Sequence, residues 1–125
     1  MKGEGIIEAV VSALQAMRPP FALYEYDIHK MVEQRLREAG FAYAHEARIG
    51  KGCRIDYLVG DVGIEIKKGK PIPAVLLRQI ERYAACEAVS GLVVITQRNV
   101  RLPKATIGKP LYGISLAQLW GVALP

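Results

Sequence analysis

Residues 54–67 read Arg-Ile-Asp-Tyr-Leu-Val-Gly-Asp-Val-Gly-Ile-Glu-Ile-Lys, and they predict two antiparallel strands joined by a tight turn. Apolar and polar side chains alternate on both sides of Gly60 and Asp61. A two-residue loop with glycine first is typical of a hairpin with a type II′ turn. With this loop, Val59 is expected to pair with Val62.

Two acidic side chains are expected to face each other across this hairpin. Counting back from the turn places Asp56 opposite Glu65. Directly opposed side chains have β-carbons about 5 Å apart, and like charges there are destabilising. A divalent cation would offset the repulsion, since Mg²⁺ binds carboxylate oxygens and keeps several of its waters. Because side chains alternate between the faces of a strand, one face should carry Arg54, Asp56, Gly63, Glu65 and Lys67. The alternative is an exposed polar face whose acids are balanced by Arg54 and Lys67.

A lysine beside such a site suits the hydrolysis of a phosphate ester. A metal-bound water is easier to deprotonate, and a nearby ammonium group can stabilise charge that develops on a phosphate. Lys67 shares the predicted face with the two acids, whereas Lys68 points to the other face by alternation. We therefore expect Lys67 to be the catalytic lysine.

Length and composition predict a single domain over residues 1–125. Hydrophobic residues make up 51% of the 125 residues and charged residues 23%, which is typical of a chain that buries a core. No apolar run approaches the roughly 20 residues of a membrane span, and the N-terminus is a poor signal peptide. Cys53 and Cys86 are expected to be reduced, buried thiols. These features predict a cytoplasmic (intracellular) protein without a membrane partner.

The charge balance favours a polyanionic partner. The formal net charge is +5 and the isoelectric point is about 9.4. For a small domain this excess of lysine and arginine points first to nucleic acid, although it also serves plain solubility.

Hydrophobic periodicity predicts the order α-α-β-β-β-α-β-β-α, with a mixed sheet of four to five strands flanked by helices. The run from Leu92 to Thr96 is continuously apolar, so it should be a central strand parallel to the hairpin's second strand. The expected helices are 4–17, 25–39, 74–89 and a short turn after Ser115 that reaches Trp120. The expected strands are 41–48, 54–59, 62–67, 92–96 and 111–114, with a turn at 49–52 and a basic loop at 97–110.

Residues 25–96 resemble the core of the PD-(D/E)xK nuclease superfamily, which has the restriction-endonuclease-like fold. The Asp of that motif falls on Asp56, and its E-x-K falls on Glu65-Ile66-Lys67. Ile55 stands where the family usually has proline. The resemblance implies a core helix, a three-stranded meander, a crossover helix and a fourth strand. It leaves helix 4–17 and the C-terminal strand and short helix, 111–121, as additions.

Two further motifs are similar to the RecB-type exonuclease branch. That branch carries a histidine in the helix before the meander, where His29 stands here, and a Q-x-x-x-Y motif on the crossover helix. The second motif matches Gln79 to Tyr83. The resemblance implies that Mg²⁺ or Mn²⁺ is held by His29, Asp56, Glu65 and the backbone carbonyl of Ile66. The four-cysteine iron–sulphur cluster of some relatives is missing here.

Other metal ligands and several DNA contacts remain open. Holliday-junction resolvases of the superfamily use a glutamate in the first helix, which would make Glu33 or Glu25 the ligand, and Glu46 is a weaker candidate. For Gln79 and Tyr83 the alternative is a surface pair, or a tyrosine packed in the core. The residues expected to contact nucleic acid are Gln79, Tyr83, Arg78, Arg82 and Lys68, and the loop from Arg98 to Lys109 could track a backbone.

The sequence therefore predicts a Mg²⁺- or Mn²⁺-dependent deoxyribonuclease that acts on single-stranded or branched DNA in recombination, repair or nucleic-acid processing. A domain this small has little surface for wrapping DNA, so a homodimer or a place in a larger complex is expected. The alternatives are a resolvase-like dimeric endonuclease and a non-catalytic nucleic-acid-binding module on the same fold.

Overall fold

A computed structural model describes residues 3–19, 27–102 and 107–121. Within these ranges the elements follow the predicted order, α-α-β-β-β-α-β-β-α. The helices are α1 (Gly3–Gln15), α2 (Ile28–Glu38), α3 (Pro73–Ala84) and α4 (Leu116–Trp120). The strands are β1 (Ala44–Gly50), β2 (Cys53–Val59), β3 (Val62–Lys67), β4 (Gly91–Thr96) and β5 (Leu111–Ser115). None of the helices in these ranges is both long enough and apolar enough to cross a bilayer.

The five strands form one mixed sheet in the order β1-β2-β3-β4-β5. Strands β1, β2 and β3 are antiparallel neighbours, whereas β3, β4 and β5 run parallel. Every residue of β4 is buried, as its continuous apolar run predicts. The mixed sheet with flanking helices is therefore confirmed, and its assignment to the restriction-endonuclease-like fold stays a prediction.

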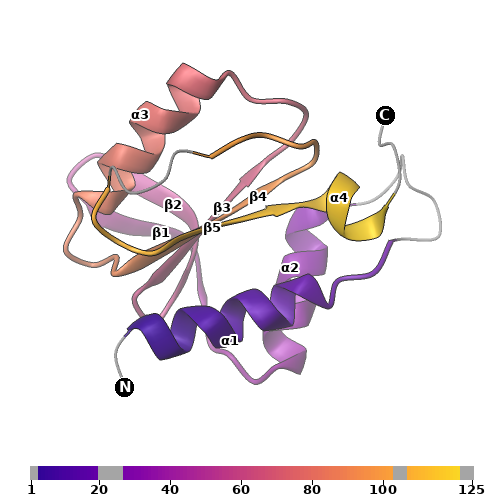
Figure 1. The fold of residues 1–125 in the computed structure, drawn as a ribbon. Helices are drawn as coiled ribbons and strands as arrows, with labels where there is room; N and C mark the ends of the chain where they lie inside the picture. Colours follow the sequence, from indigo (N-terminus) through magenta and orange to yellow (C-terminus); the bar gives the residue numbers. More distant parts are fainter. Residues whose placement is uncertain (1–2, 20–26, 103–106, 122–125) are drawn as a thin grey trace.

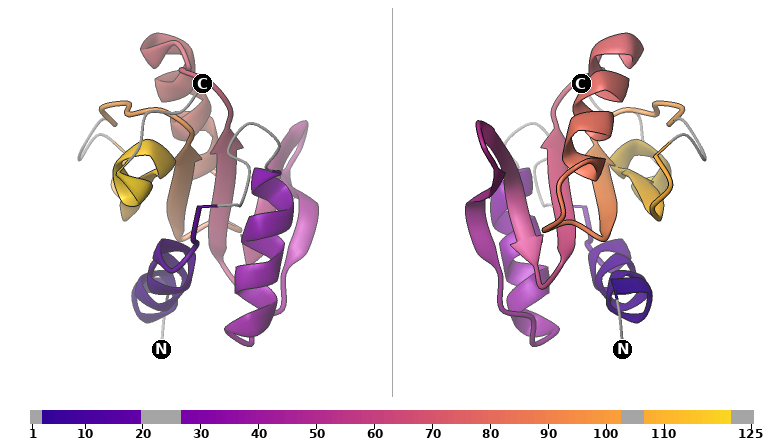
Figure 2. Two further views of the ribbon diagram at one scale, coloured as in Figure 1. Left: turned by 90° about the vertical axis from the view of Figure 1, so that its right-hand side faces the viewer. Right: turned by 90° about the vertical axis from the view of Figure 1, so that its left-hand side faces the viewer.

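Helices cover both faces of the sheet (Figures 1 and 2). Helices α1, α2 and α4 pack on one face, over a core that includes Leu14, Leu36 and Ile95. Helix α3 packs on the other face, over a second core that includes Leu76, Ile80 and Val94. The residues of β4 contribute alternately to the two cores, so the sheet is buried on both sides at its centre.

The central hairpin turns as the sequence predicts. Val59 pairs with Val62. Gly60 has a φ of 61°, and Asp61 is not among the residues with positive φ, which fits a type II′ turn and excludes a type I′ turn. The glycine is needed here because a side chain would be strained at this φ.

Two predicted boundaries near the first hairpin are wrong. Strand β1 begins at Ala44 rather than at residue 41, because the N–H of Phe41 bonds the carbonyl of Leu36 and closes the end of α2. The same strand continues to Gly50, so the turn is reduced to residues 51–52.

Helix α3 is also shorter than predicted. It ends at Ala84 rather than at residue 89. Val89 is completely buried and Ser90 donates its N–H to the carbonyl of Asp61, so the chain must leave the helix to enter the core. Lys109 satisfies the carbonyls exposed by this early end, since its Nζ donates to Cys86 at 3.1 Å and to Val89 at 2.6 Å.

The predicted alternation fails in the middle of β2. Ile55 belongs to the core under α3, whereas Tyr57 belongs to the core under α1 and α2, although alternation would place both on one face. On the partner strand, Glu46 lies at the same level, between the pairs His45–Tyr57 and Ala47–Ile55, and has a φ of 51°. This irregularity places Asp56 at the point where the strand changes faces.

The predicted polar face holds on β3 and fails at Arg54. Ile64 and Ile66 belong to the core under α1 and α2, so Gly63, Glu65 and Lys67 face α3 as alternation requires. A side chain at Gly63 would meet the Ile55 Cδ1 atom of the core under α3 at 2.6 Å. Because Ile55 faces α3, its neighbour Arg54 faces the other way, where its Nη1 lies 3.9 Å from Glu46 Oε1. Asp56, Glu65 and Lys67 are the charged members that stay together.

Candidate active site

Asp56 and Glu65 meet where strands β2 and β3 separate. The strand pairing runs from Val59 and Val62 to Tyr57 and Ile64 and goes no further along β2. Beyond it, the N–H of Asp56 donates to Glu65 Oε1 at 3.2 Å, and the N–H of Ile66 donates to Asp56 Oδ2 at 2.8 Å. The two carboxylates thus accept backbone N–H groups across the opening, just beyond the last pair of the ladder.

Lys67 lies beside this pair. Its Nζ is 3.3 Å from Glu65 Oε2, and its side chain is 25% exposed. The cluster therefore combines two carboxyl groups with one ammonium group. The alternative of an exposed polar face balanced by Arg54 and Lys67 fits Lys67, which lies beside Glu65, but Glu65 is buried and Arg54 lies beside Glu46.

Burial raises the pKa of Glu65, and the charge of Asp56 raises it further. Glu65 is only 6% exposed. Hydrogen bonds from the Asp56 N–H and from Tyr83, together with the charge of Lys67, act in the opposite direction without cancelling the rise in pKa. The ionised form of Glu65 is thus disfavoured in the folded protein, and a cation bound nearby would stabilise it.

Tyr83 reaches the cluster from helix α3, on the far side of the core. It is 3% exposed, and its hydroxyl is hydrogen-bonded to the Glu65 carboxyl group. Burial and the charge of Glu65 raise the pKa of Tyr83, so the hydroxyl stays protonated as a donor. Tyr83 is packed in the core, as the alternative expected, and it contacts Glu65. Its predicted contact with nucleic acid stays a prediction.

The other predicted DNA contacts remain at the surface. Arg78, Arg82 and Lys68 are exposed, and Gln79 is partly exposed on the same helix as the two arginines. The basic loop is less available than predicted, because the amino group of Lys109 is engaged by the carbonyls of Cys86 and Val89.

His29 lies in a different cluster, on the side of α2. Its Nδ1 is 3.4 Å from the hydroxyl of Tyr57, and its ring centroid is 6.2 Å from that of His45. The Tyr57 hydroxyl donates to Glu33 Oε2 at 2.5 Å. His29 and Glu33 are therefore brought together by Tyr57, which is not among the predicted site residues.

The predicted ligand set is not assembled. Within the described ranges, no three histidine, cysteine, aspartate or glutamate side chains are grouped so that they could hold a metal ion. Glu46 is exposed and paired with Arg54, and Glu25 lies outside the described residues.

The residues that are present still suit a hard cation. Asp56 and Glu65 offer oxygen donors at one place, and Mg²⁺ is commonly bound through one or two carboxylates, waters and substrate phosphates rather than by a complete protein cage. Burial and the charge of Asp56 raise the pKa of Glu65 although Lys67 is close, and a cation bound by the two acids would favour the ionised form of Glu65.

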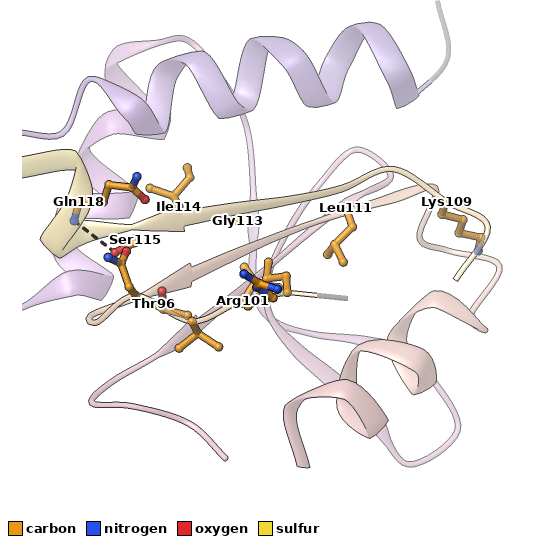
Figure 3. A pocket seen from close by; sticks show the side chains of 12 residues that line it. Thr96, Arg101, Lys109, Leu111, Gly113, Ile114, Ser115 and Gln118 are labelled. Atoms are coloured by element: carbon orange, nitrogen blue, oxygen red, sulfur yellow. Dashed lines mark hydrogen bonds between the residues drawn. The ribbon is translucent and has the colours of Figure 1, made fainter. Parts of the chain in front are cut away.

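A cavity of about 740 Å³ lies elsewhere, over β4 and β5 (Figure 3). Thr96, Ser115 and Gln118 gather at one end of it, where the Ser115 hydroxyl accepts a hydrogen bond from the Gln118 N–H at 3.2 Å and caps α4. Asp56, Glu65 and Lys67 do not line this cavity. This cavity and the cluster of Asp56, Glu65 and Lys67 are therefore separate places in the molecule.

The cysteines give a smaller correction. Cys53 is buried as predicted, but Cys86 is partly exposed; both are free thiols. Burial and the neighbouring Cys53 raise the pKa of Cys86, which makes it a poor nucleophile.

The candidate active site consists of Asp56, Glu65 and Lys67, with Tyr83 packed against Glu65. No family model, no curated protein and no solved structure matches this chain.

Proposed function

We propose that this protein is a Mg²⁺- or Mn²⁺-dependent deoxyribonuclease of the PD-(D/E)xK type. One observation carries the proposal. The carboxylates of Asp56 and Glu65 each accept a backbone N–H group from the other's strand, and Lys67 Nζ lies 3.3 Å from Glu65 Oε2. Two acids and a lysine at the opening of a hairpin form the charge pattern that hydrolysis of a phosphodiester needs.

Each residue has a separate task in this proposal. Asp56 and Glu65 would hold the divalent cation, which when bound supplies a Lewis acid for the phosphate and lowers the pKa of water. Lys67 stands where it can meet negative charge on the phosphate. Tyr83 is a positioning residue, because its hydrogen bond orients the Glu65 carboxyl group.

The surface chemistry supports a polyanionic substrate. The chain carries a net charge of +5, and Lys68 follows Lys67 directly as an exposed cation. Arg78 and Arg82 are exposed on helix α3, the helix that also supplies Tyr83. Contacts of this kind position a nucleic-acid strand without reading its sequence, and they weaken as salt rises. A homodimer or a larger complex would extend this small surface.

A second candidate is a non-catalytic nucleic-acid-binding module. The burial of Glu65 beneath Tyr83 favours it, since a ligand carboxylate must be reached by its cation. In this case the acidic pair would serve only to join β2 to β3.

A cleavage assay separates the two candidates. The substrates are end-labelled single-stranded, duplex and four-way-junction DNA, with EDTA, Mg²⁺ and Mn²⁺ arms. The parent is compared with Lys67→Ala and with Lys30→Ala, a matched control that removes the same charge from the exposed side of α2. We expect cutting that requires the metal, is lost in Lys67→Ala and is kept in Lys30→Ala.

Three other results of this assay would favour an alternative or reject the proposed site. DNA binding without cutting under any metal would favour the binding module. Preference for four-way junctions would indicate a resolvase-like enzyme. Equal activity of the parent and Lys67→Ala would reject the assigned active site.

A further inference from the structure

An apolar groove opens a few residues beyond Lys67. It has a volume of about 630 Å³ and lies between the start of helix α3 and the loop after β4. Its apolar lining consists of Pro71, Pro73, Ala74, Leu77, Val100 and Leu102. Its polar lining consists of Lys70, Asn99 and Arg101.

The turn beside this groove exposes more apolar surface. Ile72 is 66% exposed and Val75 is 50% exposed, and they are the large hydrophobic residues that stand out at the surface of the described chain. Both flank Pro73 and Ala74, which line the groove. Exposed apolar surface of this kind is typical of a binding site.

The rim of the groove is basic. Lys70 and Arg101 line it, no acidic residue does, and Lys68 and Arg98 stand near them in the two segments that form the walls. The partner that fits is therefore one that presents apolar faces together with negative charge.

The two walls are joined at their base, next to the candidate active site. The N–H of Gln97 donates to the carbonyl of Lys67 at 3.1 Å, and the N–H of Gly69 donates to Gln97 Oε1 at 2.5 Å. The groove therefore starts from the carboxyl ends of β3 and β4, at the same edge of the sheet as Lys67.

We infer that this groove holds an unstacked base of a nucleic-acid strand, while Lys70 and Arg101 hold the neighbouring phosphates. Every base has an apolar face, and apolar side chains such as isoleucine and proline are used to separate bases. The inference rests on the proposed function, because it names the substrate of the same site: a strand with unpaired bases.

Binding in EDTA tests this inference apart from cleavage. The probes are a single-stranded oligonucleotide carrying 2-aminopurine, the same sequence in a full duplex, and the strand with an abasic position in place of the probe base. We expect the single strand to bind more tightly than the duplex and the abasic strand, with a change in 2-aminopurine fluorescence on binding.

Two sets of variants connect this signal to the groove. Ile72→Ser with Val75→Ser should weaken binding of the single strand about tenfold, whereas Ile72→Leu with Val75→Leu should keep it. Lys70→Ala with Arg101→Ala should flatten the slope of log affinity against log salt by about 1.4, for two phosphate contacts. Lys30→Ala with Arg37→Ala, which removes two exposed charges from α2, is the matched control and should leave the slope unchanged.

Equal binding of duplex and single strand, or unchanged binding in both groove variants, would overturn the inference. So would binding of an acidic, apolar peptide in place of the oligonucleotide. Failure of the proposed function looks different: the strand would still bind with its fluorescence change, but would not be cut when Mg²⁺ is added.

Discussion

Asp56 and Tyr57 are neighbours on β2, yet they belong to clusters of opposite character. Asp56 joins Glu65 and Lys67, where two carboxyl groups share one ammonium group. Tyr57 donates its hydroxyl to Glu33 on the other side of the sheet, next to His29. Glu33 in turn lies 3.8 Å from Arg37, so its charge has a cation of its own.

The difference distinguishes a candidate active site from a structural polar cluster. In the Tyr57 cluster the Glu33 carboxylate has two partners, the Tyr57 hydroxyl and Arg37, and burial and Glu33 raise the pKa of Tyr57, which keeps its hydroxyl a protonated donor. In the Asp56 cluster the pKa that is raised is that of a carboxyl group, Glu65, first by burial and then by the charge of Asp56. A buried carboxyl group beside a second acid and a lysine is a candidate functional group.

The largest effect should come from Lys67. Lys67→Ala removes the cation of the Asp56 cluster, and we expect DNA cleavage to fall by about 10²–10³-fold, as for the loss of one group that stabilises transition-state charge. Single-turnover rates with Mg²⁺ and end-labelled DNA measure it, with Lys30→Ala on the exposed side of α2 as the control. A fall of less than threefold would place the chemistry elsewhere.

The next effect should be on folding, in the other cluster. Tyr57→Phe leaves Glu33 and His29 without the hydroxyl, and we expect a loss of about 1–3 kcal/mol in the free energy of unfolding. Urea denaturation measures it. Tyr43→Phe is the control, because the Tyr43 hydroxyl accepts a bond from the exposed side chain of Arg37. If both variants lose equally little, the Tyr57 cluster does not stabilise the fold as argued.

A smaller and pH-dependent effect is expected at Glu65. Its folded pKa is raised above the ordinary 4.5, so its stabilising contribution is complete below that pH and is lost as pH rises through the folded pKa. The glutamine in Glu65→Gln stays neutral at both pH values. We therefore expect the free energy of unfolding of this variant to exceed that of the parent by about 0.5–2 kcal/mol at pH 8, and to equal it near pH 4.

Thermal unfolding at the two pH values measures this difference. Glu81→Gln, on the exposed side of α3, is the control and should show no such trend. Mg²⁺ should raise the melting temperature of the parent but not that of Glu65→Gln, since a ligand stabilises only the form that binds it. If the parent is more stable than Glu65→Gln at pH 8 without metal, ionised Glu65 does not destabilise the fold as argued.

The smallest effect is expected at His29. Because it lies with Tyr57 rather than with Asp56, His29→Ala should lower cleavage by only a few-fold. The same single-turnover assay compares it with Asp56→Ala. An equal and large loss in both variants would show that α2 moves toward the metal, and would restore the ligand set that the RecB-type resemblance implies.

Much of this architecture follows from local patterns. The glycine of Gly60-Asp61 sets the turn and hence the register that brings Asp56 and Glu65 together, since pairing is counted from the turn. The continuous apolar run of β4 predicts its central place, and Ser115 predicts the cap of α4. These features depend on residues close together in the sequence, where steric preference and hydrogen bonding are decided locally.

Only the tertiary structure decided which side each polar group joins. Strict alternation would leave Ile55 and Tyr57 on one face, but the irregularity at Glu46 and Asp56 sends them into different cores. The same change separates His29 from the acidic pair and brings in Tyr83 from α3. These contacts join distant parts of the chain. They depend on how both cores pack against the sheet, and a short sequence pattern carries no information about that packing.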